Sequence, residues 1–331
     1  MKFSHVRAFK AVYELGTVTG AANYLHVTQP AVSHLIAALE DDLGFKLFDR
    51  VKGRLQPTDD GRSFYTEVDK LFLGLESLTK IGRAIRDQGT EGLVIAAMPL
   101  LSDHFIALVI QQFRRTPDGP GPLQVKTFRS DEVANRVAMQ TCDLGFSLEP
   151  SRSADVQCVH LVCDNICLVP KAMWRWGRSR SLSLEQIAEL PLIRHERDLA
   201  QDALDGLLAH PAESVGGSLE VSFASTVAAL VALGEGAAVV DPFTAHTAIQ
   251  LNRSVVTAEI KPPLPFILYL LLPRRRLLSN RAAAFLRTFD VVCRQLRVEL
   301  TVHLPGSDGA AAGPDLTITD VIERIGRNGR P

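Results

Sequence analysis

The sequence predicts an α+β protein of several domains, in which a helical N-terminal region is joined by one long helix to a larger α/β region. Residues 4–86 show mainly helical spacing of apolar side chains, whereas residues 93–272 alternate strand-like and helix-like segments. The length of 331 residues suits two or three domains. Strands that alternate with helices predict parallel sheets, and we expect two such sheets with a cleft between them.

Composition and charge exclude several classes of protein. Lys and Arg total 36 and Asp and Glu total 37, so the net charge of -1 excludes a histone-like basic protein but allows a local basic surface. The longest apolar runs, such as 266–272, are far shorter than the ~20 residues of a membrane helix. Charged residues interrupt the N-terminus, which argues against a signal peptide. Five cysteines without regular spacing predict reduced thiols. We therefore expect a cytoplasmic protein that does not enter the membrane.

Three short helices are expected at the N-terminus, over residues 4–15, 19–25 and 28–44. Apolar residues recur at helical spacing in each range. Thr19 and Thr28 are the expected N-caps of the second and third helices. Together these segments predict a helix–turn–helix.

A hairpin and a long helix follow. Strands over 45–48 and 54–57 flank a turn, and Thr58 is placed to cap a helix that runs to about Arg86. Apolar residues recur on this helix almost as a heptad seam. The residues proposed to form the seam are Phe64, Val68, Leu71, Leu75 and Leu78. The pattern predicts a dimerisation helix, with packing against its own domain as the alternative.

The third helix presents a small, uncharged face. No Asp, Glu, Lys or Arg occurs from residue 15 to residue 39. Gln29 and Ser33 lie four residues apart, as do Pro30 and His34, so these side chains share a face. Such a face fits the major groove of DNA, where Gln pairs with adenine and Ser or His contacts base edges or phosphates.

Basic side chains gather instead on the hairpin that follows. Lys46, Arg50, Lys52 and Arg54 lie there and are opposed only by Asp49. They are placed to bind phosphates or to enter the minor groove. A helix–turn–helix followed by a basic hairpin is a winged helix, and the alternative is a purely structural three-helix domain.

These residues resemble a LysR-type transcriptional regulator over residues 3 to about 297. The resemblance is carried by FKAV at 9–12, GTVTGAA at 16–22, LHVTQPAVS at 25–33, LFDR at 47–50, and then Thr58 and Gly61. It continues with LVIAA at 93–97, DLGF at 143–146, and the segment 230–242, which contains Gly234-Glu235-Gly236. The N-terminal motifs keep the family's order and spacing over nearly sixty residues.

The resemblance implies a domain organisation. It comprises a winged helix–turn–helix DNA-binding domain at 1–60, a linker and dimerisation helix with a hinge at 58–91, and an effector-binding α/β domain at 92–297 that is similar to a periplasmic binding protein. Subdomain I would take about 92–163 and 267–297, subdomain II about 164–266, and residues 298–331 would form a flexible tail. A homodimer or homotetramer on double-stranded DNA is implied, with control by a small molecule.

Matches to the family's motifs, together with the basic hairpin, give the DNA-binding candidates. These are Thr28, Gln29, Pro30, Ser33, His34, Arg50, Lys52, Arg54 and Thr58. His34 stands where the family often has Arg, so the base preference departs from the family's pattern.

The effector-binding candidates lie where strands end and helices begin, because backbone N–H groups there suit a carboxylate. They are Met98, Pro99, Leu100, Ser102, Ser130, Arg194, Ser225, Thr226 and Asp241. Each hydroxyl among them has an ordinary helix cap as its alternative. AAMP at 96–99 and VVDP at 239–242 resemble the subgroup that senses opines and related amino-acid derivatives. This implies a carboxylated effector, with Arg194 or Arg197 facing its carboxylate and Asp241 an amino or guanidino group.

Enzymatic and metal chemistry find little support in the residues. Cys158, His160, Cys163 and Cys167 fall in an extended segment, where alternation places Cys158 and His160 on one face and Cys163 and Cys167 on the other. No Gly-x-Ser-x-Gly, His-Glu-x-x-His or Walker motif occurs. We therefore expect no cofactor, no metal and no catalysis. The alternative hypotheses are a solute-binding α/β protein or an α/β enzyme, whose helical domain only dimerises.

Overall fold

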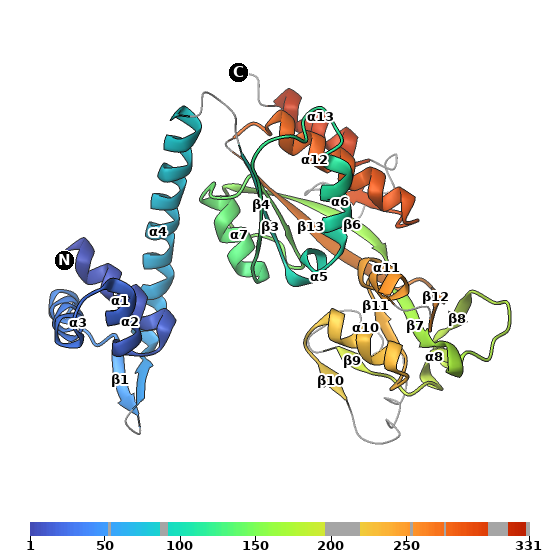
Figure 1. Ribbon diagram of the computed structural model, residues 1–331, viewed down its shortest axis with the longest axis horizontal. Helices are drawn as coiled ribbons and strands as arrows, with labels where there is room; N and C mark the ends of the chain where they lie inside the picture. Colours follow the sequence, from blue (N-terminus) through green and yellow to red (C-terminus); the bar gives the residue numbers. More distant parts are fainter. Residues whose placement is uncertain are drawn as a thin grey trace. The chain divides into compact units, whose positions relative to one another are not determined.

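The computed structural model describes residues 1–51, 54–86, 92–195, 219–251, 254–274, 276–303 and 317–328 (Figure 1). The chain forms two compact units, Met1–Ile85 and Arg86–Pro331. Each unit has its own buried apolar core. Within the described ranges, no helix has both the length and the apolar character needed to span a membrane.

The N-terminal unit is a winged helix–turn–helix followed by a long helix, as the sequence predicted. Its elements are α1 (Phe3–Leu15), α2 (Val18–Leu25), α3 (Gln29–Leu43), β1 (Phe48–Val51), β2 (Arg54–Pro57) and α4 (Asp59–Arg86). The wing strands are antiparallel, with Phe48 opposite Pro57. The sequence predicted the first wing strand over residues 45–48, but β1 begins only at Phe48. The reason is Glu40, whose carboxylate accepts the backbone N–H groups of Leu47 and Phe48 at 2.9 and 3.4 Å.

Threonine side chains begin two of these helices. Thr28 Oγ1 accepts the N–H of Ala31 at 3.4 Å, which confirms Thr28 as the N-cap of α3. The prediction of Thr19 as the cap of α2 was wrong, because Thr17 holds that position and accepts the N–H of Gly20 at 3.0 Å. Thr17 has the extended backbone of a cap, whereas Thr19 lies within the helix.

The core of the N-terminal unit centres on Phe9 of α1. Its fully buried ring lies 5.4 Å from the ring of Phe64 and 5.5 Å from that of Phe48, measured between centroids. Val68 of α4 belongs to the same core and is only 4% exposed. The first turns of α4 are thus packed against their own unit.

A group of charged side chains fastens α4 to α1. Lys10 Nζ lies 2.5 Å from a carboxylate oxygen of Asp69 and 2.7 Å from one of Glu14. The Tyr65 hydroxyl donates to Glu14 at 2.9 Å, and the Tyr65 ring stacks on Tyr13 at 3.8 Å. Burial lowers the pKa of the Lys10 ammonium, but the hydrogen bonds to Asp69 and Glu14 outweigh it, so the pKa lies above its ordinary value.

The C-terminal unit contains two sheets that define two subdomains. Subdomain I holds the sheet β14-β6-β13-β5-β3-β4, and subdomain II holds β11-β7-β12-β8. The strands of the first sheet are β3 (Leu93–Ala97), β4 (Leu123–Thr127), β5 (Leu144–Ser147), β6 (Val156–Asp164), β13 (Pro265–Pro273) and β14 (Thr301–His303). Those of the second are β7 (Ile166–Pro170), β8 (Ser181–Ser183), β11 (Ala238–Val240) and β12 (Val255–Lys261), with the short parallel pair β9 (Arg194–His195) and β10 (Glu220–Val221) beside them.

The sheets are mixed, which corrects the expectation of parallel sheets. β3, β4 and β5 are parallel, but β13 runs antiparallel to both β5 and β6, and β7 runs antiparallel to β11 and β12. The chain passes between subdomains directly from β6 to β7 and from β12 to β13. Neither crossover contains a helix that would carry the chain back to the other end of the sheet. β13 therefore re-enters the sheet of subdomain I at the end where β6 leaves it, and runs antiparallel to β6.

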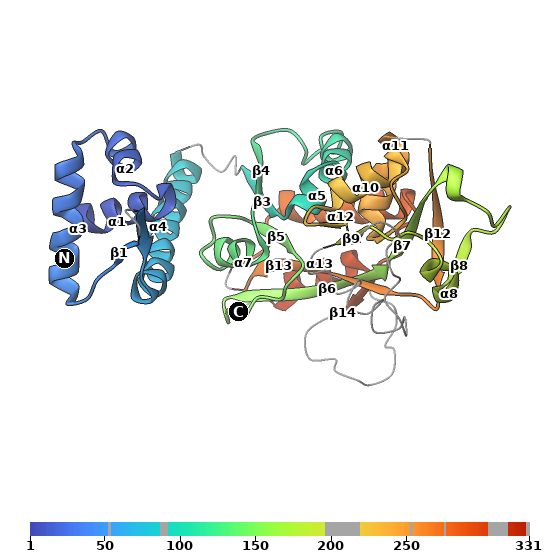
Figure 2. The same ribbon diagram turned by 90° about the horizontal axis from the view of Figure 1, so that it is seen from below.

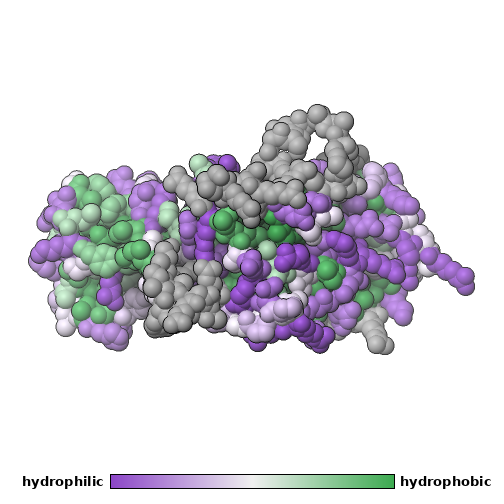
Figure 3. All heavy atoms as spheres, turned by 90° about the horizontal axis from the view of Figure 1, so that it is seen from above, coloured by the Kyte–Doolittle hydropathy of each residue, from purple (hydrophilic) through white to green (hydrophobic). Residues whose placement is uncertain are grey.

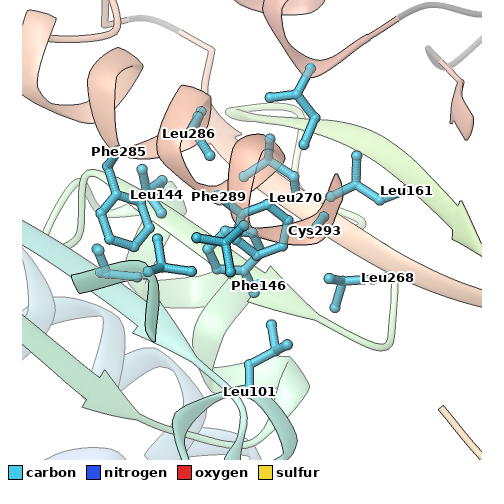
Figure 4. Close-up of a cluster of buried hydrophobic side chains, with 14 of the residues drawn as sticks. Leu101, Leu144, Phe146, Leu161, Leu268, Leu270, Phe285, Leu286, Phe289 and Cys293 are labelled. Carbon is cyan, nitrogen blue, oxygen red and sulfur yellow. The ribbon is translucent and has the colours of Figure 1, made fainter. Parts of the chain in front are cut away.

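Helices cover both faces of the first sheet. One face packs on α6 (Phe105–Phe113) and α12 (Asn280–Gln295), and the other on α7 (Ser130–Ala138). Figure 4 shows the first of these cores, where Phe146 of β5 stacks on Phe289 of α12 with ring centroids 4.8 Å apart. Because the faces alternate along β6, Cys158 and Cys163 fall in different cores, as the sequence predicted. The placement of Cys167 on the same face as Cys163 was wrong, because β6 ends at Asp164 and Cys167 lies in β7, in the core of subdomain II.

The C-terminal residues are part of this fold, so the prediction of a flexible tail over 298–331 was wrong for two segments. β14 pairs with β6, placing Val302 opposite Leu161. The helix α13 (Ile318–Asn328) packs on α12 and buries Ile318 and Val321 in the main core (Figure 2). Residues 304–316, predicted to be disordered, lie outside the described residues. β14 is ordered because it pairs with the edge of the sheet, and α13 is ordered because its apolar face packs on the core.

Candidate DNA-binding and effector-binding sites

The predicted recognition face lies on the surface of the N-terminal unit. Thr28, Gln29, Pro30, Ser33 and His34 are all exposed, while Val32 and Leu39 of the same helix are buried. The N-cap and Pro30 near the helix start fix the first turn of α3, from which Gln29 and Ser33 project. The structure thus brings these five side chains together on one uncharged, accessible face.

Thr19 of α2 is a residue that the sequence reasoning missed. Gln29 Nε2 donates a hydrogen bond to Thr19 Oγ1. This contact orients the Gln29 amide from the neighbouring helix. Thr19 lies two positions after the capping Thr17, and the sequence gave no signal of its contact with Gln29, which lies ten residues further along the chain.

The base of the wing is fixed by backbone and side-chain hydrogen bonds. Thr58 Oγ1 donates to the carbonyl of Lys46 at 2.7 Å and accepts the N–H of Gly61 at 2.9 Å. A Cβ at Gly61 would lie 2.2 Å from the carbonyl oxygen of Leu47, so only glycine fits. The Thr58 hydroxyl therefore joins the wing to α4.

The basic residues of the wing lie on different parts of it: Lys46 precedes β1, Arg50 is in β1 and Arg54 is in β2. Lys46 Nζ lies 2.7 Å from Glu40, whose carboxylate raises the pKa of the ammonium. Arg50 is in β1 and Arg54 in β2, at neighbouring positions of the hairpin. Lys52 lies outside the described residues.

The predicted dimerisation seam divides into two parts. Val68 is buried in its own unit, so its assignment to a dimer interface was wrong, and the Phe64 ring contacts Phe9 and Phe45 in that core. Leu71, Leu75 and Leu78 instead keep 49%, 40% and 64% of their surface exposed. Figure 3 shows apolar residues reaching the surface of the N-terminal unit. Only the second half of the seam is available to a partner.

The effector-binding candidates of subdomain I gather at the carboxyl ends of β3, β4 and β5. Met98 follows β3, and its N–H donates to Phe146 of β5. Ser130 begins α7 after β4, and its hydroxyl accepts the N–H of Leu148 at 3.2 Å. Ser102 donates its hydroxyl to the Met98 carbonyl at 3.1 Å. Pro99 and Leu100 belong to the short helix α5 (Pro99–Ser102). Neither serine is a helix N-cap, and both fix the loops at this edge.

The candidates of subdomain II lie at the carboxyl ends of β9, β10 and β11. Arg194 is in β9, and the exposed Ser225 and Thr226 are in the first turn of α10 (Ala224–Leu233), which follows β10. Asp241 follows β11 and caps α11 (Pro242–Leu251), accepting the N–H of Thr244 at 2.9 Å. Arg197 lies outside the described residues.

The two subdomains meet at the start of α11. The Phe243 ring lies 4.6 Å from that of Phe105 at the start of α6, and α11 also packs beside α5 (Figure 1). Burial and, to a smaller extent, the neighbouring His104 lower the pKa of His246 on α11. The carboxyl edges that carry the effector candidates are therefore adjacent at this point.

The structure offers no support for a metal centre in its described part. Among these residues, no three His, Cys, Asp or Glu side chains converge as metal ligands. Burial raises the pKa of the Cys163, Cys167 and Cys293 thiols, so these cysteines are neutral at physiological pH.

The fold and these sites define a class: a winged-helix DNA-binding unit joined by a long helix to a two-subdomain α/β binding unit. Residues 3–62 match the model of the bacterial regulatory helix-turn-helix proteins of the lysR family, and residues 86–293 match that of the LysR substrate binding domain. The chain belongs to the LysR family of transcriptional regulators. It is therefore a DNA-binding regulator with a small-molecule-binding domain.

Relatives and solved structures agree with this assignment. The regulatory protein NocR of Agrobacterium fabrum is 30% identical over 296 residues, covering 85% of this chain and 94% of NocR. The octopine catabolism/uptake operon regulatory protein OccR of Rhizobium meliloti is 31% identical, covering 74% and 81%. The crystal structure of CbnR, a LysR family transcriptional regulator, has a TM-score of 0.61 at 19% identity and covers 88% of this chain and 99% of CbnR. It shares the fold.

Proposed function

We propose that this regulator reads its operator through the first turn of α3, held in place by the wing, and that it acts by binding rather than by catalysis. The observation that carries the proposal is the exposed, uncharged face of Thr28, Gln29, Pro30, Ser33 and His34. A helix face without charged side chains enters a major groove without unpaired charges, and the wing supplies cations to the phosphates. A DNA-binding role supports a cytoplasmic location.

The exposed leucines of α4 support a homodimer. Leu71, Leu75 and Leu78 follow heptad-like spacing on an exposed helix face, which is typical of a two-helix seam. Two α4 helices paired along this face would hold two recognition helices on one operator, whether the final assembly is a dimer or a tetramer.

We further propose that the effector binds between the carboxyl edges of the two subdomains. Met98 and Ser130 lie at one edge, and Arg194 and Asp241 at the other, and α11 joins the edges through Phe243. The name of OccR refers to octopine, an amino-acid conjugate, which supports a carboxylated amino-acid-like effector here. Such a ligand shifts the arrangement of the subdomains only through its different affinity for each arrangement.

DNA binding is tested by the retardation of a labelled fragment of the gene's own upstream DNA. Wild-type protein should retard the fragment at low salt, where phosphate contacts are strongest. Gln29→Ala and Arg50→Ala should weaken retardation, whereas Gln111→Ala, at an exposed position of α6, is the matched control. No retardation by wild-type protein at low salt would favour a solute-binding protein, and turnover of a bound amino-acid derivative would favour an enzyme.

A further inference from the structure

Asn165 joins the two crossovers that connect the subdomains. It lies between β6 and β7 and is only 1% exposed. Its backbone N–H donates to the carbonyl of Leu264 at 2.8 Å, and its side-chain Nδ2 donates to the carbonyls of Leu264 and Pro265, each at 3.1 Å. Because Leu264 lies in the β12–β13 crossover and Pro265 begins β13, this one residue fastens both connections between the subdomains.

The other half of the same amide is not satisfied. Asn165 Oδ1 is buried and has no hydrogen-bond donor among the residues that the structure describes. A buried acceptor without a donor is rare in folded proteins, since its lost hydration is not compensated. An amide flip would not help, because Nδ2 already faces two carbonyl oxygens. The position therefore calls for a donor from outside these residues.

Asp241 places negative charge on the same side of the hinge. β11 pairs with β7 so that Val240 lies opposite Ile166, which brings the next residue, Asp241, level with Asn165. In the sheet order β11-β7-β12-β8, β11 and β12 flank β7 on its two sides, and Nδ2 donates to residues that follow β12. Asp241 is only 3% exposed. Burial raises the pKa of the nearby Cys163 thiol, and the negative charges of Asp241 and Asp164 raise it further.

We propose that Asn165 is a specificity-determining residue for the effector, with Oδ1 accepting an N–H from a cationic group, an ammonium or a guanidinium, beside the charge of Asp241. A carboxylate beside the unsatisfied Oδ1 favours a positively charged donor over a neutral one. This inference rests on the proposed effector site. Because Nδ2 of the same amide holds the second crossover, a ligand bound at Oδ1 acts directly on the connection between the subdomains.

The test uses pairs of probes that differ in a cationic group. Full-length protein is titrated calorimetrically with L-arginine against L-citrulline, L-lysine against L-norleucine, and with octopine. The cationic member of at least one pair should bind about 10- to 100-fold more tightly than its neutral counterpart, as expected for a hydrogen bond to a charged donor. Asn165→Leu should reduce that ratio to near one, while Asn280→Leu, at an exposed position of α12, should leave it unchanged.

A smaller variant keeps the test decisive if Asn165→Leu does not fold. Asn165→Ser retains an acceptor but shortens its reach, and it should also lower the ratio. Equal binding of both members of each pair by wild-type protein, or no binding of any probe, would overturn the inference and point to a buried water as the donor. An unchanged ratio in a folded Asn165 variant would overturn it too. Retardation of upstream DNA by the same wild-type protein separates these failures from failure of the regulatory function.

Discussion

Charge placed on the exposed leucines of α4 should abolish dimerisation. In the double variant Leu71→Lys/Leu78→Lys, two side chains that are about half exposed in the single chain become cationic. If α4 is the dimer seam, each helix then presents lysines to the apolar face of its partner. The buried residues Phe64 and Val68 are untouched, so the N-terminal unit itself should fold normally.

The size of the effect follows from the exposed fractions. Full burial of a Leu side chain contributes about 1.5–3 kcal/mol. Leu71, Leu75 and Leu78 have 49%, 40% and 64% of their surface left to bury, so pairing contributes about 2–5 kcal/mol from each protomer and about 5–9 kcal/mol for the dimer. Loss of two of the three leucines should weaken dimerisation by at least ~100-fold, since 1.4 kcal/mol is tenfold in Kd.

Sedimentation velocity over a range of protein concentrations measures this change. Wild-type protein should sediment as a dimer or larger at micromolar concentration, and the double variant should show a monomer. Thr66→Lys, at an exposed position on another face of α4, controls for the added charge. An unchanged oligomer in the double variant would refute the assignment of the seam to these leucines.

Three further changes test the N-terminal unit and the C-terminal helix. Gln29→Ala should weaken operator binding about 5- to 100-fold without changing its salt dependence, because a base contact and not a phosphate contact is removed; retardation assays at several salt concentrations check this, and equal loss on unrelated DNA would contradict it. Lys10→Met should lower the free energy of unfolding of the N-terminal unit by about 1–2 kcal/mol in urea titrations, since it breaks a partly buried ion pair with Asp69. The pKa of Lys10 is raised above its ordinary 10.5, so this contribution is complete below that value and should fade only at pH above about 11; a difference already lost at pH 9 would disprove it. Ile318→Ala should cost about 2–5 kcal/mol by leaving a cavity in the main core; thermal unfolding compares it with Glu323→Gln, and equal melting temperatures would show that α13 adds nothing to the core.

Local chemistry made the N-terminal unit predictable. The caps and apolar spacing that specify α3 lie within a few residues of one another, so Thr28 and the exposed face could be identified from the sequence. Thr19 could not be distinguished from Thr17 as a cap, because both residues are threonines and either hydroxyl can cap a helix. Their roles differ in the structure, where Thr17 accepts the N–H of Gly20 and Thr19 contacts Gln29.

Long-range packing decided what the sequence did not reveal. The heptad-like spacing on α4 continues without a break, yet Val68 packs inward and Leu71 does not. The reason is that α1 contacts one face of α4, where Val68 and Phe72 lie, and Leu71 lies on another face. The direction of β13 depends on strands that lie more than a hundred residues earlier in the chain. Asn165 is a single asparagine between two apolar strands, and nothing in its neighbours announces the hydrogen bonds that it makes.

The order of the strands also sets an order of synthesis. β13 lies between β5 and β6, although it follows all of subdomain II in the chain. Subdomain I therefore cannot close its sheet until β13 has left the ribosome, whereas Met1–Ile85 is continuous and can fold as soon as it emerges. On each nascent chain, the part that recognises the operator is complete well before the part that senses the signal.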